Sequence, residues 1–126
     1  MSTSWEVEYT DQFETWWATL PLEQQRHIAQ GVELLAEYGP SLGRPLVDTV
    51  TMSGHANMKE LRASTTRTLF AFDPRRSVIL LFGGDKSGKW NAWYDEVIPI
   101  ADDLFDDHIQ TLADEGHPEV LVIEQL

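Results

Sequence analysis

Cationic and aromatic side chains concentrate between residues 58 and 94, and these residue types suit chemistry on a phosphodiester. Lysine and arginine can hold a scissile phosphate and stabilise its pentacovalent transition state, while aromatic rings can stack on unpaired bases. A ribose 2′-hydroxyl can serve as the internal nucleophile, so this chemistry needs no metal ion. The candidates are Lys59, Arg62, Arg67, Lys86, Lys89, Trp90, Trp93 and Tyr94. The competing interpretation is that several of these bases form structural ion pairs.

Three strand-like runs and a glycine-rich loop must position these side chains. The runs span residues 58–62, 67–72 and 78–82, with a turn at 73–77, and they predict an antiparallel meander. Side chains alternate along a strand, so Lys59 and Glu60 point to opposite faces while Glu60 and Arg62 share one. The loop at 83–90 follows the third strand, and its glycines indicate a tight cationic turn.

The charge of the chain is unevenly distributed. A formal net charge of −12 argues against a nucleic-acid binder, because phosphate affinity rests on lysine and arginine. Residues 44–89, however, hold eight bases and four acids, whereas the rest of the chain holds one base and seventeen acids. The pattern predicts a local cationic surface on an acidic body. The alternative is that the acids simply fill the solvated faces of helices.

Several other chemistries are disfavoured. The loop Gly83-(four residues)-Gly88-Lys89 resembles a Walker A motif, but Trp90 stands where a magnesium-binding serine or threonine is required. The chain has no cysteine, and its four histidines lack paired ligand spacing, so we expect no metal site and no cofactor. Acidic pairs at 102–103 and 106–107 fall on a helix face where nothing would raise a carboxyl pKa.

The remaining residues predict the elements around the meander. Residues 5–9 alternate as a strand, and residues 11–20 and 21–38 have helical spacing, with Asp11 as the expected cap of the first helix. Turn-forming residues at 41–57 indicate a connector, in which Arg44 is a candidate phosphate contact. Residues 90–115 are helical, and Pro99 either kinks one helix or begins another. Residues 119–123 have strand composition.

These elements predict one α+β domain over residues 1–126. A small antiparallel sheet, formed by the first strand and the meander, packs against a helical hairpin and a C-terminal helix. No apolar run approaches the roughly 20 residues that cross a bilayer, and the N-terminus lacks signal-peptide features. We therefore expect a cytoplasmic protein that has no membrane partner.

In this order of elements the chain resembles the RelE/ParE toxin superfamily, and within it the HigB-like, phage-derived branch. The resemblance covers nearly the whole chain. It rests on the stretches Leu42–Leu46, Met58–Arg62, Arg67–Phe70 and Gly84–Trp90, together with Trp93-Tyr94.

The resemblance implies the toxin half of a type II toxin–antitoxin system. Such a toxin is a metal-independent, ribosome-dependent mRNA endoribonuclease, and its implied partners are the ribosome, mRNA and a cognate antitoxin of the helix-turn-helix, HigA-like kind. The residues that match the catalytic motif are Arg62, Arg67, Lys86 and Tyr94. The remaining candidates for RNA binding are Lys59, Lys89, Trp90, Trp93 and Arg44.

The sequence departs from the RelE pattern in two respects. Glu60 stands where RelE carries a second lysine, and the chain is acidic where RelE is basic. The alternative function is therefore a non-catalytic protein of the same fold, either a gyrase inhibitor or a co-repressor that binds an antitoxin.

Overall fold

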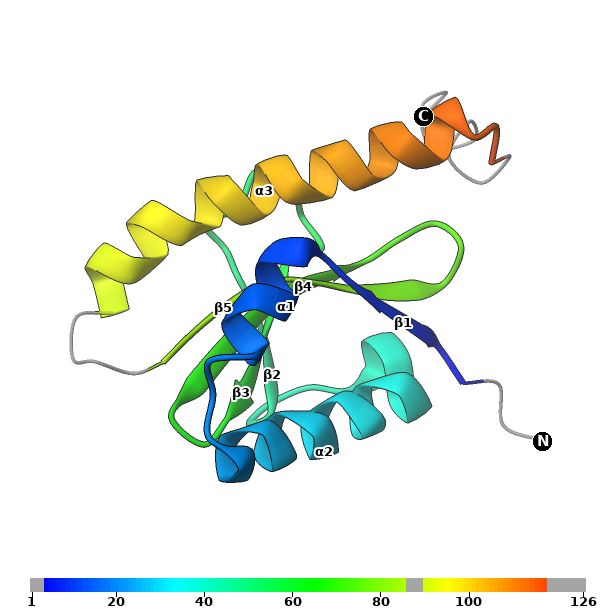
Figure 1. The fold of residues 1–126 in the computed structure, drawn as a ribbon. Helices are drawn as coiled ribbons and strands as arrows, with labels where there is room; N and C mark the ends of the chain where they lie inside the picture. Colours follow the sequence, from blue (N-terminus) through cyan, green and yellow to red (C-terminus); the bar gives the residue numbers. More distant parts are fainter. Residues whose placement is uncertain (1–3, 86–89, 118–126) are drawn as a thin grey trace.

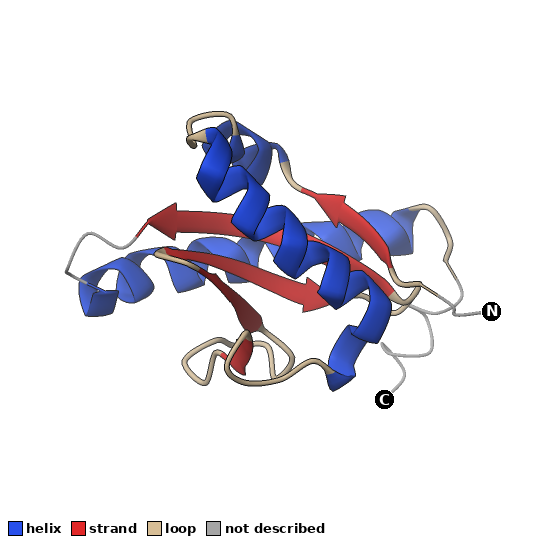
Figure 2. Cartoon of the chain, turned by 90° about the horizontal axis from the view of Figure 1, so that it is seen from below, coloured by secondary structure: helices blue, strands red, loops and turns tan. Residues whose placement is uncertain are grey.

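A five-stranded sheet forms the middle layer of the molecule, in the strand order β1-β5-β4-β3-β2. The computed structural model describes residues 4–85 and 90–117. The strands are β1 (Glu6–Tyr9), β2 (Val47–Thr49), β3 (Lys59–Ala63), β4 (Thr66–Phe72) and β5 (Ser77–Asp85). The helices are α1 (Asp11–Trp17), α2 (Leu22–Tyr38), the 3-10 helix η1 (Gly39–Ser41) and α3 (Trp90–Asp114). Helices α1 and α2 cover one face of the sheet and α3 covers the other (Figures 1 and 2).

The predicted meander is present, and the α+β class with a C-terminal helix is confirmed. Strands β3, β4 and β5 pair antiparallel in sequence order. Strand β1 differs from the all-antiparallel expectation, because it joins the sheet beside β5 and runs parallel to it. The helical hairpin α1–α2 follows β1 and carries the chain away, so β1 does not pair with the next strand in sequence.

Residues 47–49, which the sequence placed in a connector, form the short edge strand β2. Val47 is buried and lies opposite Leu61 of β3, while Asp48 lies opposite Glu60. The turn residues Gly43 and Pro45 indicated a connector, so this strand was not predicted. Burial of the single apolar residue Val47 is enough to fix three residues at the sheet edge. This correction matters for the site, since β2 supplies Asp48.

Local sequence fixes the helix ends, with one adjustment to the predicted caps. Thr10, not Asp11, caps α1: its hydroxyl accepts from the Phe13 N–H at 3.0 Å and donates to the Leu81 carbonyl at 2.7 Å. The N–H of Gly39, which has a positive φ of 58°, closes α2 on the Leu35 carbonyl. A side chain at Gly39 would collide with the Trp5 indole, since an added Cβ would lie 2.3 Å from Trp5 Nε1.

Pro99 lies inside α3, which continues from Trp90 to Asp114 as one helix. The proline is on the exposed side, so its missing N–H leaves no buried carbonyl against the sheet. No helix within residues 4–85 and 90–117 is both long and apolar enough to cross a membrane. The strand composition noted at 119–123 lies outside the described residues.

Alternation along the strands divides the apolar side chains between two cores. Met58, Leu69 and Leu81 pack beneath α3, against Val97 and Ala101. Phe13, Ile28 and Leu35 of the hairpin pack on the other face against Leu61 and Phe70. A residue's position in a strand therefore decides which helical layer it meets.

A buried ionic cluster ties β1, the β4–β5 turn and α3 together. The Asp73 side chain has no exposed surface and accepts hydrogen bonds from the Ser77 N–H at 3.0 Å and Arg75 Nε at 2.8 Å. His108 Nε2 of α3 lies 2.9 Å from the same carboxylate, and Arg75 also pairs with Glu8 of β1. Burial opposes the charge, but the hydrogen bonds from His108 and Arg75 outweigh it and hold the pKa of Asp73 below its usual range.

We expect Asp73→Ala to lower the free energy of unfolding by about 3–5 kcal/mol, because it removes a fully buried carboxylate and leaves the Ser77 N–H and His108 without their hydrogen-bond partner. A lowered folded pKa stabilises the protein above the unfolded pKa of about 3.9, and this contribution is lost as the pH falls through the folded value. The stability gap between wild type and Asp73→Asn in urea unfolding should thus shrink below about pH 4. Asp107→Asn, on the exposed side of α3, is the matched control; an equal loss in that variant would contradict the role of burial.

Candidate functional site

Arg62 and Arg67 face each other across strands β3 and β4, and both lie on the sheet face that α3 covers. The register pairs Arg62 with Arg67, and Arg67 with Gly84 of β5. Directly opposite residues have Cβ atoms about 5 Å apart and share a face. Met58 packs beneath α3. Because Glu60 and Arg62 follow it at intervals of two residues, their side chains lie on the same face, which is the face that α3 covers.

Lys59 lies on the opposite face, as the alternation predicted. Its ammonium group is 3.4 Å from the Thr49 hydroxyl on the neighbouring edge strand β2. Leu61 and Ala63, which share its side of β3, pack in the core beneath α1 and α2. The structure therefore does not bring Lys59 to Arg62 and Arg67.

Glu60 is the centre of the site, although the sequence identified it only as a departure from a basic pattern. It is buried, and one carboxylate oxygen accepts from Arg62 Nε at 2.8 Å. The other oxygen accepts from the Tyr94 hydroxyl at 2.6 Å, which brings α3 onto the sheet at this point. Arg62, Glu60 and Tyr94 thus form one continuous hydrogen-bonded group.

The environment of Tyr94 keeps its phenol neutral. Burial and the adjacent Glu60 carboxylate raise the pKa of Tyr94 to about 12, against an opposing effect of Arg67 and Arg62. At neutral pH the hydroxyl is therefore a hydrogen-bond donor and not a base. The opposing effect also shows that the charges of both arginines are felt at the Tyr94 hydroxyl.

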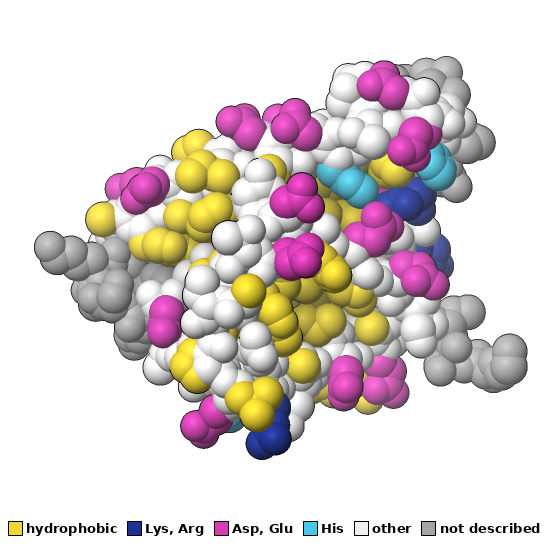
Figure 3. Space-filling model, viewed as in Figure 1, with side chains coloured by type: hydrophobic (Ala, Val, Ile, Leu, Met, Phe, Trp, Pro, Cys, Tyr) yellow, Lys and Arg dark blue, Asp and Glu magenta, His cyan; other side chains and the backbone are white. Residues whose placement is uncertain are grey.

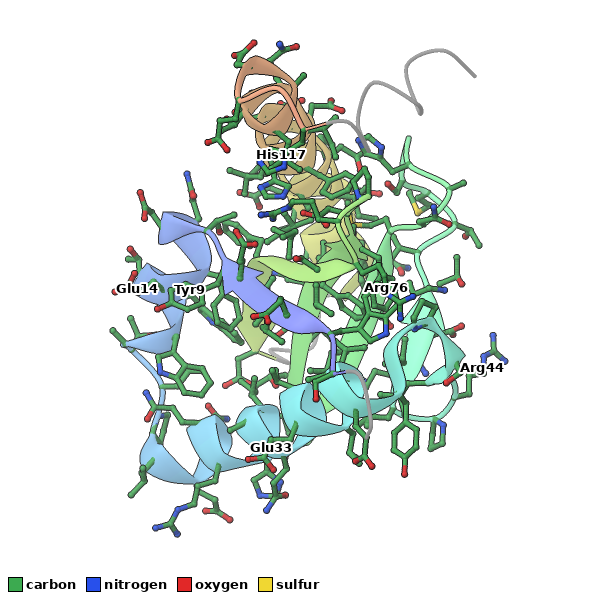
Figure 4. All side chains as sticks on the ribbon, turned by 90° about the vertical axis from the view of Figure 1, so that its right-hand side faces the viewer. Tyr9, Glu14, Glu33, Arg44, Arg76 and His117 are labelled. Carbon is green, nitrogen blue, oxygen red and sulfur yellow. The ribbon has the colours of Figure 1, made fainter. Side chains whose placement is uncertain are left out.

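Asp48 extends the group to the exposed residue Arg44. Its carboxylate lies 3.2 Å from Arg62 Nη2 and 3.1 Å from Arg44 Nε. The hydrogen bond from Arg44 is the main reason that the pKa of Asp48 is lowered. Figure 4 shows Arg44 pointing away from the body of the molecule, at the outer end of this row of alternating charges. The ion pair with Asp48 links Arg44 to Arg62, and the role of Arg44 as a phosphate contact stays a prediction.

Trp93 is seated on the backbone of β5. An added Cβ at Gly84 would lie 2.5 Å from the indole of Trp93, so only glycine permits this contact. The ring also makes an edge-on contact with Tyr94, at 5.0 Å between centroids and 71° between planes. Gly83 and Gly84 belong to the strand itself, which corrects the expectation that these glycines form a turn.

The remaining predicted residues occupy the segment after β5. Lys86 and Lys89 lie outside the described residues, and Trp90 begins α3 without a described side chain.

Arg67 lies near the start of β4, where its guanidinium donates a hydrogen bond of 2.9 Å to the Thr66 carbonyl. No group of three or more histidine, cysteine or acidic side chains in the described part of the chain is arranged to hold a metal ion.

The sequence placed Glu60 on the same face as Arg62 but gave no sign that Asp48 is a second partner. Glu60 is two residues from Arg62 and Asp48 is fourteen residues away, and only the β2–β3 register brings the second carboxylate to the guanidinium. The alternation rule already placed Glu60 beside Arg62, and this was the one available signal.

Solved structures define the fold class of the chain. It resembles the RelE–RelB complex from Pyrococcus horikoshii OT3, with a TM-score of 0.56 and 16% identity over 68% of this chain and 98% of that one. The RelBE2 toxin–antitoxin complex of Mycobacterium tuberculosis gives a TM-score of 0.53 at 15% identity, over 65% of this chain and 98% of that one. The fold is therefore that of the RelE structures.

The family follows from the sequence comparisons. Residues 15–106 match the family described as phage derived protein Gp49-like (DUF891), and the chain belongs to this family. HigB3, a candidate toxin of Mycobacterium tuberculosis, is 52% identical over 93 residues, which are 72% of this chain and 82% of HigB3. HigB2 of the same organism, also a candidate toxin, is 43% identical over 118 residues, which are 90% of this chain and 58% of HigB2. The chain thus spans a little over half the length of HigB2, and the HigB-like resemblance seen in the sequence is confirmed.

The ionisation of Tyr94 tests the geometry of the site. We expect its phenolate absorbance, taken as the difference between wild type and Tyr94→Phe, to appear only near pH 12. Glu60→Gln should lower this pKa part of the way, because it removes the neighbouring negative charge but leaves the burial. A Tyr94 that ionises near its ordinary value of about 10 in the folded wild type would show that the contact with Glu60 is not made.

Proposed function

We propose that this chain is the toxin of a type II toxin–antitoxin system and cleaves mRNA on the translating ribosome without a metal ion. Two lines support the toxin assignment: membership of the Gp49-like family, with relatives named as candidate toxins, and the fold of the RelE structures. The observation that carries the catalytic assignment is the placement of Arg62 opposite Arg67, with Tyr94 bonded to the Glu60 that holds Arg62.

In the proposed reaction the ribose 2′-hydroxyl loses its proton to solvent and its oxygen attacks the adjacent phosphorus, while the P–O5′ bond breaks and the leaving 5′-oxygen takes up a proton. Arg62 and Arg67 stabilise the charge that develops on the phosphoryl oxygens, and Lys86 adds a third cation. Tyr94, neutral at physiological pH, exchanges the hydrogen bond that it donates to Glu60 for one to the reacting phosphate. The RNA on either side of the reacting phosphate contacts Arg44, Lys89, Trp90 and Trp93. Lys59 contacts it only where the RNA passes around the edge of the β-sheet.

Glu60 and Asp48 have a positioning role in this proposal. They fix the guanidinium of Arg62 through hydrogen bonds at 2.8 and 3.2 Å, and they also compete with an RNA phosphate for it. A chain with net charge −12 repels free RNA at long range. Productive binding is then favoured where mRNA is already held in place, which is the physical reason to propose the ribosome as the site of action in the cytoplasm.

The proposed partner is a cognate antitoxin of the helix-turn-helix, HigA-like kind. The support is that structures sharing the fold are complexes of RelE with RelB. An antitoxin that covers Arg62, Arg67 and Lys86 with acidic groups would exclude RNA both sterically and electrostatically.

One observation favours a second candidate function, a non-catalytic binding protein that inhibits gyrase or serves as a co-repressor with an antitoxin. Arg62 contacts two carboxylates, so its charge is already compensated inside the protein. Induction of the chain in cells separates the two functions. Cleavage of translated mRNA supports the ribonuclease, whereas a DNA-damage response with intact mRNA supports gyrase inhibition.

Replacing the paired arginines tests the catalytic assignment. We expect Arg62→Ala or Arg67→Ala to lower mRNA cleavage by about 10²–10³, because each removes a contact made to the transition state. Growth after induction and primer extension on a reporter mRNA measure the effect. Arg26→Ala, which removes an exposed cation of α2, is the control for charge. Full toxicity in both site variants, with circular dichroism showing that they fold, would refute the assignment.

A second experiment concerns Lys86 and Lys89, which we expect to bind RNA phosphates without reading bases. The double variant Lys86→Ala/Lys89→Ala should weaken affinity for all single-stranded sequences alike. Each lost contact should reduce the slope of log K against log salt by about 0.7. An unchanged slope, measured by fluorescence anisotropy with labelled RNA, would place the loop outside the RNA path.

A further inference from the structure

An apolar groove opens between β1, α1 and α2, on the face of the sheet opposite to the arginines. Phe13 forms its floor, Tyr9, Trp17 and Val32 line its walls, and Glu14 and Glu33 stand at its rim; its volume is about 540 Å³. Figure 3 shows apolar side chains gathered in this hollow, with acidic side chains around it. Tyr9 is 58% exposed, which is unusual for a large ring beside a core.

The groove is bordered by an open sheet edge. Strand β1 is the outermost strand and pairs only with β5 among the described residues. The Thr10 N–H donates to Leu80 of β5, and the main-chain groups of successive strand residues point alternately to the two edges. Val7 and Tyr9 therefore direct their N–H and C=O groups away from β5. Figure 4 shows β1 on the near side of the molecule, with α1 and α2 flanking it.

The groove is also negatively charged. Glu14 and Glu33 are exposed, and neither takes part in an ion pair within residues 4–85 and 90–117. Glu6 of β1 is likewise exposed on the other side of the strand. The helices α1 and α2 together carry five acids (Asp11, Glu14, Glu23, Glu33 and Glu37) against the single base Arg26. A second copy of this acidic chain would bring like charges together here.

We propose that a basic, extended segment of another polypeptide docks at this edge by adding a strand to β1. Its backbone would pair with the outward groups of Val7 and Tyr9, which a small apolar ligand has no means to satisfy. Alternate apolar side chains would enter the groove beside Tyr9 and Val32. Basic side chains at the intervening positions would point to the other face of the strand, toward Glu6, and basic side chains that flank the apolar ones would meet Glu14 and Glu33 at the groove rim.

This docking edge is independent of the proposed catalytic function. The groove lies under α1 and α2, whereas Arg62, Arg67 and Tyr94 lie on the α3 face. A segment bound at β1 therefore leaves the arginines accessible, and the proposal stands or fails separately from ribonuclease activity.

The test uses the full chain and a labelled ten-residue peptide with two lysines at each end and alternating valine and lysine between them, its ends blocked. We expect saturable binding in fluorescence anisotropy. Tyr9→Ala should weaken binding because it removes a groove wall, and Glu14→Lys/Glu33→Lys should weaken it by about 10-fold at low salt. Asp103→Lys/Asp107→Lys is the matched double charge reversal on the exposed side of α3 and should leave affinity unchanged. N-methylation of alternate peptide groups, at the positions facing β1, should abolish binding.

Three outcomes would overturn the proposal. An alternating valine–glutamate peptide that binds as tightly would remove the charge argument. An equal loss of affinity in Asp103→Lys/Asp107→Lys would show attraction to the whole acidic surface instead of to the groove. Binding of the N-methylated peptide at full strength would show that the groove takes apolar side chains without strand pairing.

Discussion

The site depends on one buried carboxylate, that of Glu60. A carboxylate with so little exposed surface is stable only where charged or hydrogen-bonding partners replace water. Here Arg62 comes from the same strand and Tyr94 comes from α3, so a single side chain fixes a guanidinium and docks a helix. The arginine pair, the neutral phenol and the position of the first turns of α3 all follow from satisfying this group.

The strand period of two separates the functions that we assign. Glu60, Arg62 and Arg67 point toward α3, whereas Lys59 and Leu61 point toward α2. The cationic character of residues 44–89 is therefore divided between two faces and is further reduced by Asp48 and Glu60. A net count of charges along the sequence overstates the cationic surface, because it ignores which face each residue occupies and which carboxylate it meets.

Much of the fold could be predicted from local pattern, and the errors share one cause. The meander, the hairpin and the long helix leave clear periods of two or 3.6 residues in the sequence, and the positions of Arg62, Arg67 and Tyr94 followed from them and from the family resemblance. The parallel docking of β1, the edge strand β2 and the partners of Arg62 did not, since each depends on residues that meet only after the sheet has formed. The cap at Thr10 is the exception, because its hydroxyl accepts from the Phe13 N–H only three residues on and the error is a local one of one residue.

The two adjacent glycines of β5 have a consequence for how such chains are interpreted. Gly83 lies against the indole of Trp16 and Gly84 against that of Trp93, on opposite sides of the same backbone. Close contact with the Trp16 indole thus requires a glycine at position 83, five residues before Gly88-Lys89 in the sequence. The resulting string imitates a nucleotide-binding signature for reasons that have nothing to do with nucleotides. Packing can therefore supply a glycine that completes a misleading motif, and a search by motif alone would assign this chain to the wrong class of protein.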